Sequence, residues 1–307
     1  MCELWEKVKN VFNKKCDHPG LNPVPVFHGT SGTSGMSGSS GWAGKYALIV
    51  GINKYATPGN DLSGCVNDAM NMRELLINKF RFPADNIRML TDERATIENI
   101  IDRLYWLISQ RGELVYHHSG HGTQMRDRNG DELNDGLDEV LVTYDHDWDN
   151  PLSDDLIANM FGRKSPESYL TMICDTCHSG TMNRGYSTQY GASKGTPKFL
   201  APPVDIASRS AGRAFRHNRF RNRKYIAKEN ILLSGCKDNQ SSMDAYIDGT
   251  FQGVMTASFI KSMERFVRPT WKELHTTMVE IVNKWDFTQD PQLTGSEELK
   301  SRPVFGG

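Results

Sequence analysis

From residue 45 onward, short apolar runs alternate with segments in which apolar residues recur every three or four positions. The runs predict buried strands at 46–52, 87–90, 113–118, 139–143, 169–174 and 231–235. The helical spacing predicts helices at 65–80, 97–108, 154–161, 250–266 and 270–285. This alternation predicts an α/β domain with a mostly parallel central sheet and helices on both faces. In such sheets the working residues gather beyond the carboxyl ends of the strands.

The first 44 residues differ from the rest. Residues 1–16 can form a short amphipathic helix, which either docks on the main domain or binds a partner or a membrane surface. Residues 29–44 (GTSGTSGMSGSSGWAG) have the composition of a flexible linker. We therefore divide the chain into an arm and linker at 1–44 and a folded domain at 45–307. The domain has a catalytic part at 45–184, a basic connecting loop at 185–228 and a smaller part at 229–307.

Composition narrows the class of protein. The chain has 307 residues, 38% of them hydrophobic, and a net charge of -1, which excludes wholesale disorder, a coiled coil and a nucleic-acid coat protein. No apolar run reaches the ~18 residues of a membrane span. Six cysteines do not form a disulfide framework, the N-terminus does not resemble a signal peptide, and Cys2 stands where myristoylation needs glycine. We expect a cytoplasmic protein.

Two predicted strands run into glycine-containing turns that carry reactive side chains. LVYHHSGHGT at 114–123 presents His121, and YLTMICDTCHSG at 169–180 presents Cys177. If the two strands are neighbours, a thiol and an imidazole meet at the rim of the sheet. This pair is typical of nucleophilic catalysis, with the thiol as nucleophile and the imidazole handling protons. No third member of a triad is evident.

Other interpretations of the cysteine motif stay open on these residues alone. Cys174 through His178 match the haem c attachment pattern, and the nearby histidines permit a zinc site. Against both, Cys174 ends an apolar strand while Cys177 lies in the turn. A buried structural cysteine is the third interpretation, which the second reactive turn at His121 disfavours.

Together these motifs resemble those of caspase-like cysteine proteases, the metacaspases in particular. The resemblance rests on HSGHG at 118–122 and DTCHSG at 175–180, and also on ALIVGINKY, LSGCVNDA, DELNDGLDE, SGCKDNQ and PQLTG in the same order. It covers 45–307 apart from the segment at 185–228. It implies a caspase-like three-layer sandwich and a dyad of His121 and Cys177, with the backbone N–H groups of Gly122 and Cys177 holding the oxyanion.

The resemblance also implies a pocket for a basic side chain. It maps onto Cys65, Asp68, Ser119 and Asp175. Two carboxylates attract a guanidinium or ammonium group and repel an acidic side chain. We therefore expect protein or peptide substrates with Arg or Lys before the scissile bond, and a monomeric enzyme without haem or nucleotide.

Calcium is the cofactor that the resemblance implies. Residues 127–155 contain eleven acids and one Arg, and DRNGDE at 127–132 lacks the glycine of an EF-hand loop. The family's activating Ca²⁺ site maps onto Asp138, Asp154 and Asp155. A further family carboxylate falls near Arg184, where this chain has no acid, so a solvated acidic face is the alternative.

The segment 184–228 has the opposite charge, with eleven Lys or Arg and Asp205 as its one acid. Aromatics interleave with bases in RAFRHNRFRNRKY, as in nucleic-acid-binding arms. Because the loop lies beside an acidic pocket, self-cleavage is the interpretation we favour over nucleic-acid binding or a passive solvated loop. The alternative for the whole chain is a non-catalytic caspase-like interaction module that uses the arm and the basic loop.

Overall fold

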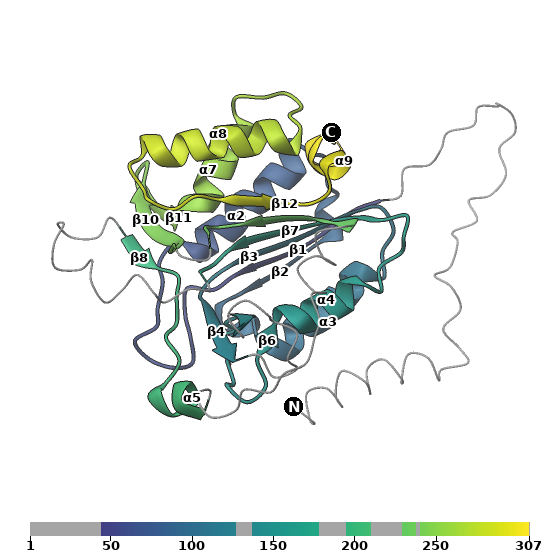
Figure 1. Cartoon of the computed structure of the whole chain (residues 1–307). Helices are drawn as coiled ribbons and strands as arrows, with labels where there is room; N and C mark the ends of the chain where they lie inside the picture. Colours follow the sequence, from purple (N-terminus) through teal and green to yellow (C-terminus); the bar gives the residue numbers. More distant parts are fainter. Residues whose placement is uncertain (1–43, 127–136, 178–194, 210–228, 238–239, 307) are drawn as a thin grey trace, which may run out of the picture. The chain divides into compact units, whose positions relative to one another are not determined.

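The computed structural model describes residues 44–126, 137–177, 195–209, 229–237 and 240–306. The arm at 1–43, residues 127–136 of the acidic segment and most of the basic loop therefore lie outside the described residues. The predicted central sheet is present (Figure 1). Its six strands lie in the order β12 (Gln292–Thr294), β9 (Ile231–Ser234), β7 (Tyr169–Asp175), β3 (Glu113–Ser119), β1 (Lys45–Gly51) and β2 (Ile87–Thr91). All neighbouring pairs are parallel except β12 with β9, which confirms the predicted α/β class.

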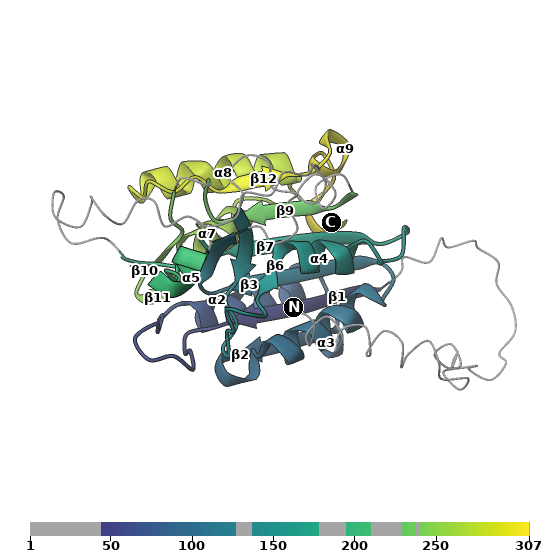
Figure 2. The same cartoon turned by 60° about the horizontal axis from the view of Figure 1, so that its bottom comes forward.

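Helices cover both faces of this sheet (Figures 1 and 2). One face carries α2 (Cys65–Asn78), α7 (Val254–Met263), α8 (Trp271–Lys284) and the short α9 (Glu297–Lys300). The other face carries α3 (Ile97–Ile108) and α4 (Asp154–Phe161). Side-chain caps fix several helix starts; at α8, Thr270 and Glu273 form a reciprocal capping box. Single-turn 3-10 helices lie at η1 (Ala84–Asn86), η2 (Asp92–Arg94) and η3 (Val304–Gly306).

The largest described core lies between the sheet and the α2, α7 and α8 layer. The ring of Phe305 makes edge-on contacts with Phe80 and Trp271 at centroid distances of 4.8 and 5.3 Å. Ala47 and Ile49 of β1 are fully buried in the same cluster. The sheet is therefore buried on this face as the continuous apolar runs predicted.

Two smaller sheets were not predicted. One joins β4 (Gly122–Arg126), β5 (Leu137–Leu141) and β6 (Leu152–Ser153); the other joins β8 (Gly195–Pro197), β10 (Met243–Ile247) and β11 (Thr250–Gly253). The strand predicted at 139–143 thus begins and ends two residues earlier. The helix predicted from residue 250 was wrong over its first turn, because Asp248 and Gly249, with φ of 50° and 91°, form a tight hairpin turn before β11. Helix α5 (Val204–Arg209) follows β8 in the basic loop.

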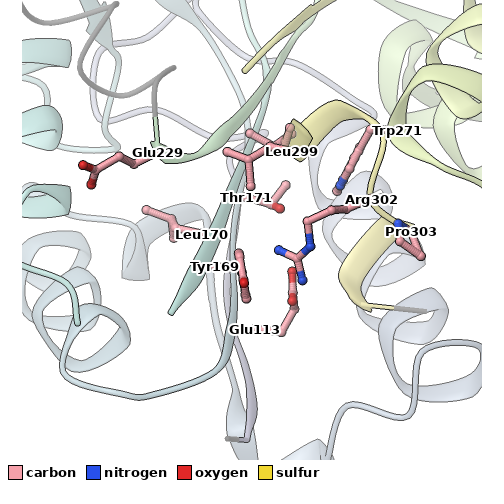
Figure 3. A pocket seen from close by; sticks show the side chains of 10 residues that line it. Glu113, Tyr169, Leu170, Thr171, Glu229, Trp271, Leu299, Arg302 and Pro303 are labelled. Carbon is pink, nitrogen blue, oxygen red and sulfur yellow. The ribbon is translucent and has the colours of Figure 1, made fainter. Parts of the chain in front are cut away.

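The two reactive strand ends lie side by side. β3 pairs with β7 in parallel, with Ser119 opposite Asp175. The other end of β3 begins at Glu113, where a small hollow lies between Arg302, Tyr169 and neighbouring residues, with the Arg302 guanidinium directed toward Glu113 (Figure 3). The reactive turns are therefore at the opposite edge of the sheet from this hollow. Across the described ranges, the helices are all too short or too polar to cross a bilayer.

Candidate active site

A lysine from the basic loop fills the predicted pocket. The Nζ of Lys198 lies 3.1 Å from Asp68 Oδ2, 3.2 Å from Asp175 Oδ2 and 2.8 Å from Ser119 Oγ. The side chains of Lys198, Asp68 and Asp175 are all fully buried. The ammonium group has three N–H donors, and these three oxygens supply an acceptor for each of them.

The two pocket carboxylates are held by the N-terminus of α7 and by nearby hydroxyl groups. The backbone N–H of Gly253 donates to Asp68 Oδ1 and Oδ2 at 2.9 and 3.0 Å. The backbone N–H and hydroxyl of Thr256 both donate to Asp175 Oδ2 at 2.9 Å, and the Ser242 hydroxyl donates to Oδ1 at 2.6 Å. A helix N-terminus favours anions, so α7 stabilises both charges.

The pKa values of the two pocket acids shift in opposite directions. Burial raises the pKa of Asp68 to about 6, although Lys198 opposes the rise. Burial also acts on Asp175, but there the Lys198 ammonium and the bonds from Ser242 and Thr256 outweigh it and lower the pKa. Burial disfavours the charged form of Lys198, but its attraction to the carboxylates of Asp175 and Asp68 outweighs burial and raises its pKa. The pocket thus holds a charged ammonium group between carboxylates at neutral pH.

The chain around Lys198 is bound in an extended form; we call residues 195–200 the inserted segment. Its strand β8 pairs antiparallel with β10, and the Lys198 N–H donates to the Ser242 carbonyl at 2.9 Å. The Lys198 carbonyl accepts from the backbone N–H of Gly122 at 2.9 Å and of Cys177 at 3.2 Å. Leu200 N–H donates to the Gly122 carbonyl at 2.9 Å. Figure 1 shows β8 beside β10 and β11, beyond one end of the central sheet.

His121 is oriented by a backbone carbonyl. Its Nε2 lies 2.8 Å from the Asn60 oxygen, which can only accept, so the proton is on Nε2. Its buried Nδ1 has no hydrogen-bond partner within the described ranges. The backbone N–H of His121 donates to the Tyr55 hydroxyl at 2.7 Å, and the centroids of the two rings lie 5.0 Å apart. Burial lowers the pKa of His121 despite the bond to Asn60, which favours a neutral imidazole with Nδ1 able to accept a proton.

Cys177 lies immediately after β7 and is fully buried beneath the inserted segment. Its thiol donates to the Gln240 carbonyl at 3.2 Å, and the Cys236 thiol donates to the same oxygen at 3.2 Å. The hydrogen bond with Cys177, together with burial, raises the pKa of Cys236. Cys236 therefore stays protonated. Of these two cysteines, Cys177 is the one whose backbone N–H donates to the Lys198 carbonyl.

The remaining predicted residues divide into two groups. Cys65 is buried beside the pocket, where burial raises the pKa of its thiol and makes it unreactive. Asp138 is a buried residue of β5, and Asp154 and Asp155 form the first turn of α4. The pairing of Val140 with Ser153 brings these acids to neighbouring positions. Within the described ranges, however, no three His, Cys, Asp or Glu side chains gather closely enough to hold a metal ion.

Several contacts of this site were not predicted. They come from Tyr55, Asn60, Lys198, Ser242, Gly253 and Thr256. Asn60 acts through a backbone carbonyl, which has no signature in the side-chain sequence. Lys198 was one of eleven bases in its segment, with nothing in the spacing to single it out. Gly253 ends the hairpin of β10 and β11, and Ser242 directly precedes it; the Asp248-Gly249 turn was the sequence signal for this hairpin.

Comparisons with known proteins agree with this geometry. Residues 45–184 match the family described as "Metacaspase, peptidase C14 domain". Metacaspase-1 of Candida glabrata is 31% identical over 289 residues, covering 82% of this chain and 73% of that protein. Metacaspase-1 of Arabidopsis thaliana is 37% identical over 241 residues, covering 74% of this chain and 61% of that protein.

A crystal structure of a protein from Geobacter sulfurreducens is similar with a TM-score of 0.61 and 21% identity, covering 85% of this chain and 98% of that one. At this identity the likeness concerns the fold alone, and it agrees with a caspase-like three-layer sandwich. The sequence matches carry the family assignment. The chain belongs to the metacaspases, the peptidase C14 family of cysteine-type endopeptidases.

Proposed function

We propose that this metacaspase cleaves peptide bonds after Lys or Arg through Cys177 and His121, and that it cleaves its own chain between Lys198 and Phe199. The observation that carries the proposal is the binding of Lys198. Its ammonium group lies between Asp68 and Asp175, while its carbonyl accepts from two backbone N–H groups, one of them that of Cys177. A residue before a scissile bond needs both contacts at once.

The chemistry follows from these contacts. His121 takes the Cys177 proton at Nδ1, and the thiolate attacks the Lys198 carbonyl carbon. The N–H groups of Gly122 and Cys177 stabilise the oxyanion that forms, because they already face this oxygen. The C–N bond to Phe199 breaks as His121 returns the proton to the leaving amine. Water then hydrolyses the thioester and frees the Lys198 carboxylate.

The Asn60 carbonyl has a positioning role in this scheme. It holds the Nε2 proton and keeps Nδ1 as the basic atom. When the imidazole becomes protonated, the same carbonyl stabilises the cation at Nε2. A backbone carbonyl thereby does the work of the third triad residue that the sequence lacks.

The inserted segment also blocks other substrates until it is cut. It fills the pocket and covers Cys177, which is fully buried. A peptide in solution must therefore compete with a lysine that belongs to the same chain, whose effective concentration is high. We propose that cleavage at Lys198 permits this segment to leave and admits peptide substrates.

Calcium binding, a monomeric state and a cytoplasmic location complete the proposal. Asp138, Asp154 and Asp155 do not form a metal site as they lie in this structure, so Ca²⁺ would have to draw their carboxylate oxygens, its preferred ligands, together, and it would offset part of the negative charge of the acidic segment. The four described cysteines, Cys65, Cys174, Cys177 and Cys236, are free thiols, which supports a reducing compartment.

The test uses intact-mass spectrometry of the purified chain and of Cys177→Ala, each with and without Ca²⁺. We expect two fragments from the unsubstituted chain, one ending at Lys198 and one beginning at Phe199, and none from Cys177→Ala. Fluorogenic peptides ending in Lys, Arg or Asp measure cleavage of other substrates. Cleavage after Asp but not Lys or Arg would overturn the pocket assignment. Absence of turnover by folded protein with reduced thiols would favour the interaction module.

A further inference from the structure

Gly253 closes the far end of the basic pocket, and its backbone does not require glycine. It is the N-cap residue of α7, with φ of -70° and ψ of 133°. Every amino acid with a side chain adopts these angles readily. The reason for a glycine at this position must therefore be the space around it.

That space is the one that the ammonium group occupies. A Cβ on Gly253 would lie 2.1 Å from Lys198 Nζ, 2.1 Å from Asp175 Oδ2 and 2.6 Å from Asp68 Oδ2. All three atoms are ends of side chains, and none belongs to the backbone. An added methyl group would thus leave the backbone of α7 intact, displace the bound ammonium group and press on the ends of both carboxylates.

We infer that Gly253 is a specificity-determining residue, which sets the depth of the pocket to the length of a lysine. The inference rests on the proposed function, because it takes the Lys198 site as the substrate pocket. The three oxygens around Nζ fix where the cation lies, and the absent side chain of Gly253 leaves room for it there. A methyl group at position 253 shortens the pocket by about one methylene, so it should favour a shorter cation.

The test compares Gly253→Ala with the unsubstituted enzyme on three fluorogenic peptides. They share the chain's own sequence Gly-Thr-Pro and end in Lys, Arg or ornithine, which is one methylene shorter than Lys. We expect kcat/KM for Lys and Arg to fall by about 10- to 100-fold in Gly253→Ala, and the ratio of ornithine to Lys to rise by about tenfold or more. Self-cleavage at Lys198 should slow by a similar factor.

Gly249→Ala is the matched control. It adds the same methyl group four residues away, in the hairpin turn, where a Cβ has no atom within 4 Å. Its positive φ of 91° makes the substitution destabilising, so it tests whether lost stability alone changes selectivity. We expect a lower Tm and an unchanged ratio of ornithine to Lys. The alkylation rate of Cys177 by iodoacetamide, measured on chains already cleaved at Lys198, checks that the dyad is intact in both variants.

A second measurement needs no variant. Because the pocket has little room beyond Nζ, the unsubstituted enzyme should cleave the Arg peptide, whose guanidinium extends past this point, more slowly than the Lys peptide. It should cleave a peptide ending in Nε-methyl-lysine about tenfold or more slowly than the Lys peptide. Equal cleavage of the Lys and Nε-methyl-lysine peptides would overturn the inference. It would also be overturned if Gly253→Ala retained the activity on the Lys peptide, or if this variant, with an intact dyad, lost its activity on the Lys and ornithine peptides equally. Failure of the unsubstituted enzyme on every basic peptide would instead overturn the proposed function.

Discussion

Replacing Lys198 by Met tests the electrostatics of the buried pocket. Lys198→Met removes the ammonium group and keeps a side chain of similar length. The Lys198→Met variant and the parent with which it is compared both carry Cys177→Ala, so that neither is cleaved during the measurement. The substitution leaves Asp68 and Asp175 buried without the cation that lies 3.1 and 3.2 Å from them.

The loss should be large at high pH. At an effective dielectric constant of about 20, each contact is worth about 5 kcal/mol of attraction before desolvation is counted. Removing one partner of a buried ion pair costs about 3–5 kcal/mol, because the remaining charge stays buried. We therefore expect Lys198→Met to lower the free energy of unfolding by about 3–5 kcal/mol near pH 8.

The loss should be smaller at low pH, and the reason lies in Asp68. With Lys198 present, the pKa of Asp68 is about 6. Without the cation it rises further, so above pH 6 the folded variant binds more protons at Asp68 than the folded parent does. The loss therefore grows with pH by at most about 1.4 kcal/mol per pH unit, and at about pH 5.5 it is smaller than at about pH 8 by up to about 3 kcal/mol.

Denaturant-induced unfolding at both pH values measures this difference. Lys237→Met is the control, since it removes a half-exposed lysine paired with Asp290 and should cost less than about 1 kcal/mol at either pH. A loss from Lys198→Met that is the same at both pH values, or below about 1 kcal/mol near pH 8, would refute the buried ion triad.

Three further predictions concern other parts of the molecule. Glu113→Gln should raise the free energy of unfolding by up to about 3 kcal/mol above pH 7 and leave it unchanged below pH 4, because burial, only partly offset by Arg302, raises the pKa of Glu113 from 4.5 to about 7. A denaturation series across pH checks this; a variant that parallels the parent at every pH would contradict it. Tyr55→Phe removes the acceptor of the backbone N–H of His121 and should lower kcat about tenfold with KM nearly unchanged, which steady-state kinetics can measure. Asp138→Ala should abolish stimulation by Ca²⁺ in peptidase assays while basal activity remains, and a calcium response equal to that of the parent would exclude this residue from the site.

Much of the fold followed from periodicity. Continuous apolar runs marked the buried strands, and the turns after β3 and β7 marked one edge of the sheet. The pairing of β3 with β7 then brings Ser119 beside Asp175, and Asp68 of α2 reaches the same place from a helix that packs on that sheet. Ser119 and Asp175 were predictable as strand ends, whereas the assignment of Asp68 to the pocket came from the family resemblance.

The pocket contacts that were not predicted were missed for one reason, which is that the hairpin of β10 and β11 was not predicted. Helical spacing in α7 continues backward through Phe251, so the predicted helix began at residue 250. In that arrangement the helix N-terminus would lie a turn too early to donate to the pocket carboxylates, and β11, which pairs with β10 on the side away from β8, would not form. The turn at Asp248 and Gly249 ends β10, reverses the chain and places Gly253 at the start of α7. One tight turn therefore decides both where the helix begins and what the pocket binds. Residues 248–253 separate β10, which pairs with the inserted segment, from the N-terminus of α7, which donates to the pocket carboxylates of Asp68 and Asp175.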